Sequence, residues 1–245
     1  MQNIEVNSTI SVPTAAFNQC TGVLTVNAPL LPSDVSPEEE EYVMGVGTFR
    51  YGAFTKIIIG KDVKEIPNAT FYQCNKVVEV VIEEGLEILG PFAFDTCSKL
   101  KTINLPSTLT KIGAGALSGT AIESITIPEG ITVLSAKTLR GCSALTTVIL
   151  PTSLTKIGNY AFSGCTSLKE IVIPKNVVTI GTGIFGDCES AMSIYFMPSE
   201  PPTIAYLGDV ASDIKVIYVP SGSLEKYKSV FGTYYGAIMQ PYDFE

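Results

Sequence analysis

A period of about 23 residues runs through almost the whole sequence. The intervals between its six cysteines are 54, 23, 45, 23 and 23 residues, so each interval is built on a unit of that length. Residues 100–106, 145–151 and 168–174 also share one pattern, in which alternating apolar residues end at a proline. One such unit is too small to bury its own apolar side chains, whereas stacked units cover each other. The period therefore predicts a solenoid.

The unit boundaries follow from the first apolar residue of each pattern. We expect coils to start near residues 23, 54, 77, 100, 122, 145, 168, 191 and 214. The 31-residue interval is attributed to a surface insertion around residues 33–41, and the 22-residue interval to a residue missing near Thr120. Because the repeat covers nearly the whole chain, we expect a single domain over residues 1–245, with a cap over residues 219–245.

Alternating apolar residues at the start of each unit indicate a short β-strand with every second side chain in the core. Strands that recur while the chain always returns the same way must pair in parallel. The prediction is a right-handed solenoid with one long parallel sheet and return segments that are irregular or short 3₁₀ or helical pieces. The one α-helix of note is expected at residues 223–231, where Leu224, Tyr227 and Phe231 share a face that would cover the last coil.

The complete motif of the unit is L-x-x-I-x-I-P, then V-x-x-I-G-x-x-A-F-x-x-C, and its clearest copies are residues 145–167 and 168–190. This motif resembles the BspA-like, or Treponema-type, leucine-rich repeats of bacterial surface proteins, and the resemblance extends over about residues 12–220. The tail from Val219 resembles the C-terminal cap common in these proteins. The resemblance implies a leucine-rich-repeat solenoid that is exported or surface-attached, is not an enzyme, and belongs with proteins associated with adhesion. The chain departs from the motif at Gly52 and Thr120, where the cysteine is absent.

The composition excludes several classes of function. Lys and Arg total 16 and Asp and Glu total 24, which gives a net charge of −8 and argues against binding to nucleic acid or an anionic membrane. The absence of histidine excludes a Ser-His-Asp triad and any His-ligated metal site. No apolar run approaches the ~20 residues that span a bilayer, so no membrane insertion is expected. Without a CxxC pair, we expect neither a metal nor a cofactor.

Two further motifs are interpreted as parts of the repeat or its loops. Residues 181–186 match G-x-G-x-x-G, but Gly181 has the same phase as Gly113 and Gly158, which favours a structural role. The acidic run at residues 38–41 is interpreted as a solvated loop, with contact to a cation or a basic partner as the alternative.

The cysteines that share one position of the unit are expected to form a buried column of reduced thiols: Cys74, Cys97, Cys142, Cys165 and Cys188.

The fifth residue of each unit should point away from the core. Six of the nine residues in this column are aliphatic or aromatic: Asn27, Ile58, Val81, Asn104, Thr126, Ile149, Val172, Tyr195 and Tyr218. Such residues suit strands without any function, yet a contiguous apolar stripe often marks an interaction surface, and Tyr is common in binding hot spots.

We therefore predict a binding site on the C-terminal half of the sheet face. It consists of Ile149, Val172, Tyr195 and Tyr218 and is flanked by Met192, and the polar neighbours Glu170 and Lys215 would set the orientation of a partner. The alternative is that the cap folds back over this stripe and leaves nothing to bind.

Together these features predict a non-enzymatic interaction or adhesion module whose partner is a protein or a glycan on a host or neighbouring cell surface. One alternative is a structural spacer of a larger surface assembly. Another is a carboxylate-based hydrolase, which needs two carboxylates about 5–9.5 Å apart at a cleft. Residues 1–5 do not form a secretion signal, so the chain is expected to be the mature part of a secreted or cell-surface protein, or else a cytoplasmic one.

Overall fold

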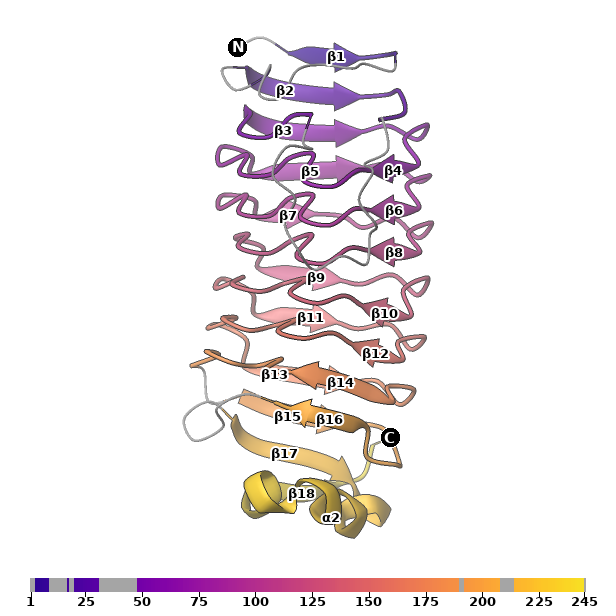
Figure 1. Cartoon of the computed structure of the whole chain (residues 1–245), viewed down its shortest axis with the longest axis vertical. Helices are drawn as coiled ribbons and strands as arrows, with labels where there is room; N and C mark the ends of the chain where they lie inside the picture. The colour runs from indigo at the N-terminus through magenta and orange to yellow at the C-terminus, as the bar shows by residue number, and fades with distance from the viewer. Residues whose placement is uncertain are drawn as a thin grey trace.

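The computed structural model of the chain describes residues 3–8, 17, 20–30, 48–189, 192–207 and 214–244. The chain winds into an elongated stack of about nine turns, with its N-terminal strand at one end and a helix at the other (Figure 1). All strand pairs are parallel, as the repeat predicts. The predicted parallel solenoid is therefore confirmed, and each coil has three sides.

The first side, which we call the strand face, carries the strand that opens each coil. Its strands pair in three runs, β1-β2-β3-β5-β7, β9-β11 and β13-β15-β17-β18. In chain order they are β1 (Ile4–Val6), β2 (Thr21–Val26), β3 (Ala53–Ile59), β5 (Glu79–Ile82), β7 (Thr102–Ile103), β9 (Ser124–Thr126), β11 (Thr147–Ile149), β13 (Glu170–Ile173), β15 (Met192–Phe196), β17 (Ile214–Pro220) and β18 (Met239–Tyr242).

The second side, the short-strand side, differs from the prediction of a single sheet. It carries a further parallel ladder in two runs, β4-β6-β8 and β10-β12-β14-β16. Coils of equal length bring equivalent residues to strand spacing, so their backbones pair there too. The strands are β4 (Glu65–Ile66), β6 (Ile88–Leu89), β8 (Lys111–Ile112), β10 (Val133–Leu134), β12 (Lys156–Ile157), β14 (Thr179–Thr182) and β16 (Thr203–Tyr206).

The third side, the turn side, consists of stacked turns that lead from one short strand to the next coil. Backbone amides there donate to the following coil, as from Ala69 N to Pro91 O (2.9 Å) and from Phe71 N to Ala93 O (2.8 Å). One turn position has a positive φ in successive coils, 56° at Tyr160 and 61° at Gly183. The turn side thus repeats as strictly as the two ladders.

Between the three sides lies one continuous apolar core. Rings at equivalent positions stack through it, with centroids 5.5 Å apart for Phe49 and Phe71 and 5.0 Å apart for Phe71 and Phe94. Each fully buried apolar side chain contributes roughly 1.5–3 kcal/mol. Because every coil adds the same set of side chains, stability accumulates along the stack.

The ends of the stack depart from the predicted boundaries. In the first coil a bulge precedes Val23, and Leu24 pairs with Ile57 and Thr25 with Ile58. The outward residue of this coil is therefore Thr25, and Asn27, placed there by the sequence, lies past the strand. β1 adds one strand before the first predicted coil and β18 adds one after the last.

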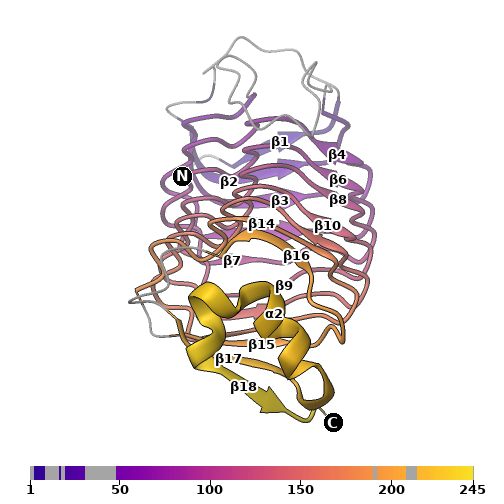
Figure 2. The same cartoon turned by 60° about the horizontal axis from the view of Figure 1, so that its bottom comes forward.

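The cap follows the prediction and is longer. After the 3₁₀ turn η1 (Ser221–Ser223), α2 (Leu224–Tyr235) lies across the open end of the last coil (Figure 2), and η2 (Gly236–Ile238) leads to β18. Tyr227 is fully buried, its ring lies 5.7 Å from that of Phe196, and its hydroxyl donates to Pro198 O at 2.9 Å. The helix therefore seals the core that the final coil would otherwise expose to water.

Candidate functional site

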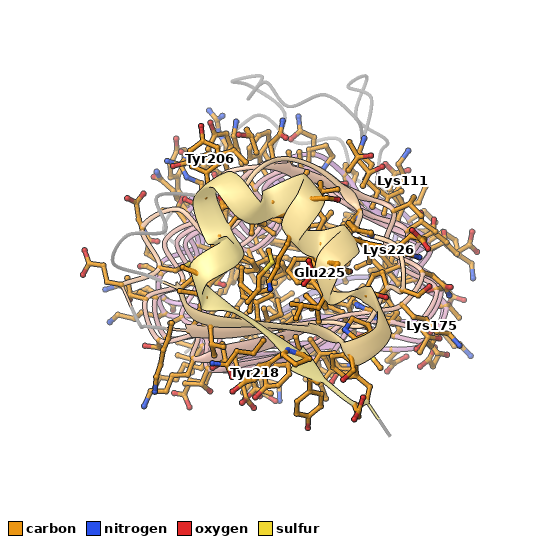
Figure 3. All side chains as sticks on the ribbon, turned by 90° about the horizontal axis from the view of Figure 1, so that it is seen from below. Lys111, Lys175, Tyr206, Tyr218, Glu225 and Lys226 are labelled. Atoms are coloured by element: carbon orange, nitrogen blue, oxygen red, sulfur yellow. The ribbon has the colours of Figure 1, made fainter. Side chains whose placement is uncertain are left out.

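The predicted binding residues from four strands lie next to one another on the strand face. Val172 is in register with Tyr195, and Tyr195 with Tyr218, while Ile149 lies on β11 beside β13. Ile149 and Val172 are 57% and 46% exposed. We call Ile149, Val172, Tyr195 and Tyr218 the apolar stripe. Figure 3 shows Tyr218 on the outer side of the sheet, opposite Tyr206.

The two tyrosines of the apolar stripe belong to a cluster that the sequence did not reveal. Their rings stack with centroids 4.7 Å apart, and Tyr242 from β18 packs at 5.6 Å from Tyr195 and 5.4 Å from Tyr218. Phe244 lies 4.8 Å from Tyr242. We call these four rings the aromatic cluster. Tyr242 and Phe244 were missed because they follow the last repeat, where the 23-residue phase gives no guide; their alternation in the tail was the only signal.

Met192, predicted to flank the site, is not on the surface. Its side chain is fully buried. Alternation along β15 explains this: Ser193 and Tyr195 face outward, so Met192 lies on the inward side together with Ile194 and Phe196. Met192 is therefore part of the core.

Charged residues border the apolar stripe as expected. Glu170 and Lys215 are exposed on the neighbouring strands β13 and β17. Burial raises the pKa of the Tyr195 hydroxyl, and the nearby Tyr218 and Glu170 raise it further. Tyr195 therefore stays neutral at physiological pH, and the apolar stripe lies near the charged side chains of Glu170 and Lys215.

The cap reaches the aromatic half of the apolar stripe only. Tyr242 contacts both tyrosines and is itself 43% exposed. The large exposed fractions of Ile149 and Val172 show that the aliphatic half remains open. The alternative that the cap covers the stripe and leaves nothing exposed is therefore wrong, because the aliphatic half is open to solvent.

Two carboxylates also share a hollow on the strand face. Glu84 and Glu129 line a depression of about 810 Å³. Glu84 accepts hydrogen bonds from the amide and hydroxyl of Ser107, at 3.2 and 3.0 Å, and Glu129 accepts the equivalent bonds from Thr152, at 3.0 and 2.9 Å. Backbone donors lower the pKa of both carboxyls. A hydrolase needs one carboxylic acid with a raised pKa, so this pair lacks the proton donor.

The cysteine column is buried as predicted. All six cysteines are free thiols, and the five in the column are fully buried. Each Sγ of the column donates to a carbonyl in the preceding coil at 3.1–3.2 Å: Cys74 to Phe49, Cys97 to Phe71, Cys142 to Leu117, Cys165 to Leu139 and Cys188 to Phe162. Burial raises the pKa of Cys97, Cys142 and Cys165. A nucleophilic thiolate is therefore disfavoured.

The G-x-G-x-x-G run serves the coil geometry. A Cβ on Gly181 would lie 2.6 Å from Asn159 N, and one on Gly183 would lie 2.6 Å from the Tyr160 ring. Both glycines permit close stacking of coils, which supports their structural interpretation. The acidic run at residues 38–41 lies outside the described residues. Within the described ranges, no group of three Cys, Asp or Glu residues could hold a metal ion, and no helix is long and apolar enough to cross a bilayer.

Comparisons with known proteins agree with this architecture. A family model described as "BspA type Leucine rich repeat region" matches six copies over residues 43–143 and 64–192, which together exceed half of the chain. The fold is similar to that of a leucine rich cell surface protein from Faecalibacterium prausnitzii A2-165, with a TM-score of 0.57 and 24% identity over 83% of this chain. The chain spans 64% of the length of that protein.

A second similar structure is the T. pallidum leucine-rich repeat protein. Its TM-score is 0.61, at 23% identity over 74% of this chain and 85% of that one. At these identities the two structures support the fold alone. No curated protein shows a significant sequence match.

Proposed function

We propose that this chain, which belongs to the BspA-type leucine-rich repeat family, is a protein-binding module of a bacterial cell surface and that its partner docks on the apolar stripe. The observation that carries the proposal is the open aliphatic half of the stripe, Ile149 and Val172, directly beside the aromatic cluster. Exposed large apolar residues that adjoin one another are a feature of interaction sites. The family supports a surface location, and the proposed activity is binding and adhesion, not catalysis.

The arrangement of the rings favours a protein partner over a glycan. Tyr195 and Tyr218 stack at an interplanar angle of 17°, so each covers a face of the other. A sugar that stacks on an aromatic side chain needs a free ring face. Apolar side chains of a protein can pack against ring edges and against the aliphatic Ile149 and Val172.

The dimensions also suit the centre of a protein interface. Four successive strands at ~4.8 Å spacing give the apolar stripe a length of about 14 Å. In protein interfaces a few central apolar anchors supply most of the affinity, and polar neighbours form a rim around them. Glu170 and Lys215 occupy that rim and would select the orientation of the partner.

The test is a binding screen against immobilised matrix proteins and a glycan array, followed by a double variant, Ile149→Ser with Val172→Ser. We expect a protein hit whose affinity falls at least ~10-fold in this variant. The matched control is Ile58→Ser with Val81→Ser, which changes the same outward column on β3 and β5 and should leave binding intact. Equal loss in both variants would argue against a localised site. Binding to glycans alone would contradict a protein partner, and no binding to any probe would favour the structural spacer.

A further inference from the structure

One boundary between coils lacks both of the strand ladders that join the other coils. Between residues 100–121 and residues 122–144, β7 is not paired with β9 and β8 is not paired with β10, although residues 48–189 are all described. We call this boundary the seam. The strand face has another gap, between β11 and β13, but the short-strand ladder continues there through β12 and β14. The seam is the double interruption in the described part of the stack.

The cause of the seam is the short coil. In regular coils the turn before each strand closes with a backbone bond, from Leu100 N to Cys97 O (2.9 Å) and from Leu145 N to Cys142 O (3.0 Å). The corresponding segment from Thr120 to Ile122 is one residue shorter and cannot form this three-residue closure. β9 is therefore offset from β7. In regular neighbouring coils, equivalent residues of successive strands lie level, as on β3 and β5.

A side chain on β7 reinforces the separation. Asn104 donates to Ile82 O at 2.7 Å and accepts from Ile82 N at 2.9 Å. These two bonds attach the end of β7 to β5 and substitute for a longer backbone ladder. β7 thus belongs to the N-terminal part of the stack, and β9 belongs to the part that follows.

The turn side, in contrast, is continuous across the seam. Its bonds run from Gly115 N to Ala136 O, Leu117 N to Thr138 O and Gly119 N to Arg140 O, at 2.9, 3.0 and 2.7 Å. On the same side, the Cys142 thiol donates to Leu117 O at 3.2 Å and lies 3.3 Å from the Thr120 hydroxyl. Other polar links across the seam include a hydrogen bond from the Ser135 hydroxyl to Ile112 O and an exposed Lys101–Glu123 ion pair at 3.6 Å. Exposed ion pairs contribute little, so the backbone connection is one-sided.

Three surface hollows border the seam. One of about 440 Å³ lies between Thr102 and Ser124, and the one of about 810 Å³ extends from Asn104 to Ile149; both are on the strand face. A third of about 600 Å³ lies on the short-strand side and extends from Thr110 across the seam to Gly181. The hollows thus lie on the two sides on which the ladders are interrupted.

We infer that the seam is a hinge: the two parts of the solenoid bend about the bonded turn side, and the strand face and short-strand side open and close. Motions of this kind occur where few hydrogen bonds cross between two rigid bodies. Because Ile149 lines the hollow of about 810 Å³ that borders the seam, bending changes the surface next to the apolar stripe. The inference concerns the free protein and does not depend on the proposed function.

The direct test measures distances across the seam from dipolar broadening in continuous-wave EPR, which suits labels two strands apart at ~4.8 Å per strand. Spin labels at Thr102→Cys and Thr147→Cys span two coils and cross the seam, and labels at Thr147→Cys and Ser193→Cys span two coils without crossing it. Both pairs carry Cys20→Ser, since the other native thiols are buried. We expect the distance distribution across the seam to be roughly twice as wide as that of the control pair. Equal widths would overturn the hinge.

A second variant tests the cause. Thr120→Cys with one serine inserted before Ala121 restores the Cys-Ser-Ala turn found at residues 142–144. If the short turn creates the hinge, this variant should narrow the distribution across the seam to the control width and slow amide exchange in residues 122–134 at least ~10-fold. A variant that folds with an unchanged distribution would refute this cause. If the variant fails to fold, the labelled protein without the insertion still decides whether the hinge exists, because the width of its distance distribution across the seam is compared with that of the control pair.

Discussion

The turn side and the strand face are built by the same repeat, yet they differ in how strictly they follow it. On the turn side, a thiol donor, a positive-φ residue and backbone bonds to the next coil recur through the stack, and the bonds continue even across the seam. On the strand face, the outward residue changes from Thr25 through Asn104 to Tyr218, and the ladder is interrupted twice.

This contrast separates the residues that maintain the fold from those that are free to specify binding. A turn-side residue contacts its equivalents in two neighbouring coils, so a change there disturbs both contacts. An outward residue on the strand face contacts water on one side, and a backbone ladder such as that between β13 and β15 does not depend on its identity. Asn104, whose side chain bonds to the backbone of Ile82, is an exception. Variation of the outward residue from coil to coil is therefore expected on a surface that binds partners.

The largest expected effect concerns the thiols. Because the five column cysteines are fully buried, they should react with an aromatic disulfide reagent only when the protein opens, at least ~10³-fold more slowly than exposed thiols. Titration of the native protein should detect at most the half-buried Cys20, and titration in denaturant should detect all six. Rapid reaction of several thiols in the native state, or a total below six, would contradict a sealed turn side.

Removal of a core ring that borders the turn side should lower the stability more than any other substitution considered. Phe162 is fully buried and stacks on Phe185 at 5.9 Å, so Phe162→Ala should lower the free energy of unfolding by about 3–5 kcal/mol. The matched change on the strand face, Val172→Ala, should cost no more than about 0.5 kcal/mol. Urea denaturation of both variants measures the difference. Similar losses would remove the distinction between the two sides.

A turn glycine should have an intermediate effect. Gly183 has a φ of 61° and faces the Tyr160 ring, so Gly183→Ala should destabilise by about 1–3 kcal/mol through backbone strain and contact with the ring. Adding Tyr160→Ala should restore the part due to the ring and leave the backbone cost. A double-mutant cycle from thermal unfolding checks this. Strict additivity would show that ring and glycine do not interact.

The smallest expected effect is a pH dependence of the unfolding free energy that arises from Glu129, in the turn after β9. Hydrogen bonds from Thr152 and Ser153 lower the pKa of Glu129 in the folded state. Its carboxylate therefore stabilises the fold above the unfolded-state pKa of about 4.3, and the stabilisation is lost as the pH falls through the lower folded-state pKa. The difference in unfolding free energy between the wild type and Glu129→Gln should thus shrink between pH 5 and roughly pH 3. A difference that grows on acidification would reverse the assigned direction.

The period of the sequence was sufficient to predict the parallel solenoid, the cysteine column and the cap helix, because each depends on residues that recur at one phase or share one helix face. It was insufficient at the first coil, because Thr25 and Asn27 have the same parity along the chain and only the pairing of β2 with β3 shows that Thr25 lies opposite Ile58. Met192 was misassigned although alternation from Tyr195 places its side chain inward.

The short-strand ladder and the aromatic cluster were missed for different reasons. A two-residue strand such as β6 leaves no alternation to detect, and it forms because neighbouring coils position its backbone. The aromatic cluster joins Tyr195 and Tyr218 to Tyr242 and Phe244, which lie beyond the last repeat. Contacts between a repeat and its cap depend on the path of the chain through α2, which the repeat does not encode.

The central claim is that the fold is maintained by the core and the turn side, and that the open aliphatic half of the apolar stripe is free for binding. Its most direct test is the unfolding free energy of the double variant Ile149→Ser with Val172→Ser, measured by urea denaturation. Since both side chains are about half exposed or more, we predict a value within about 1 kcal/mol of the wild type and an unchanged cooperative transition. A loss of 3 kcal/mol or more, comparable with that expected for Phe162→Ala, would show that these residues belong to the structure and that the proposed surface is not free to bind.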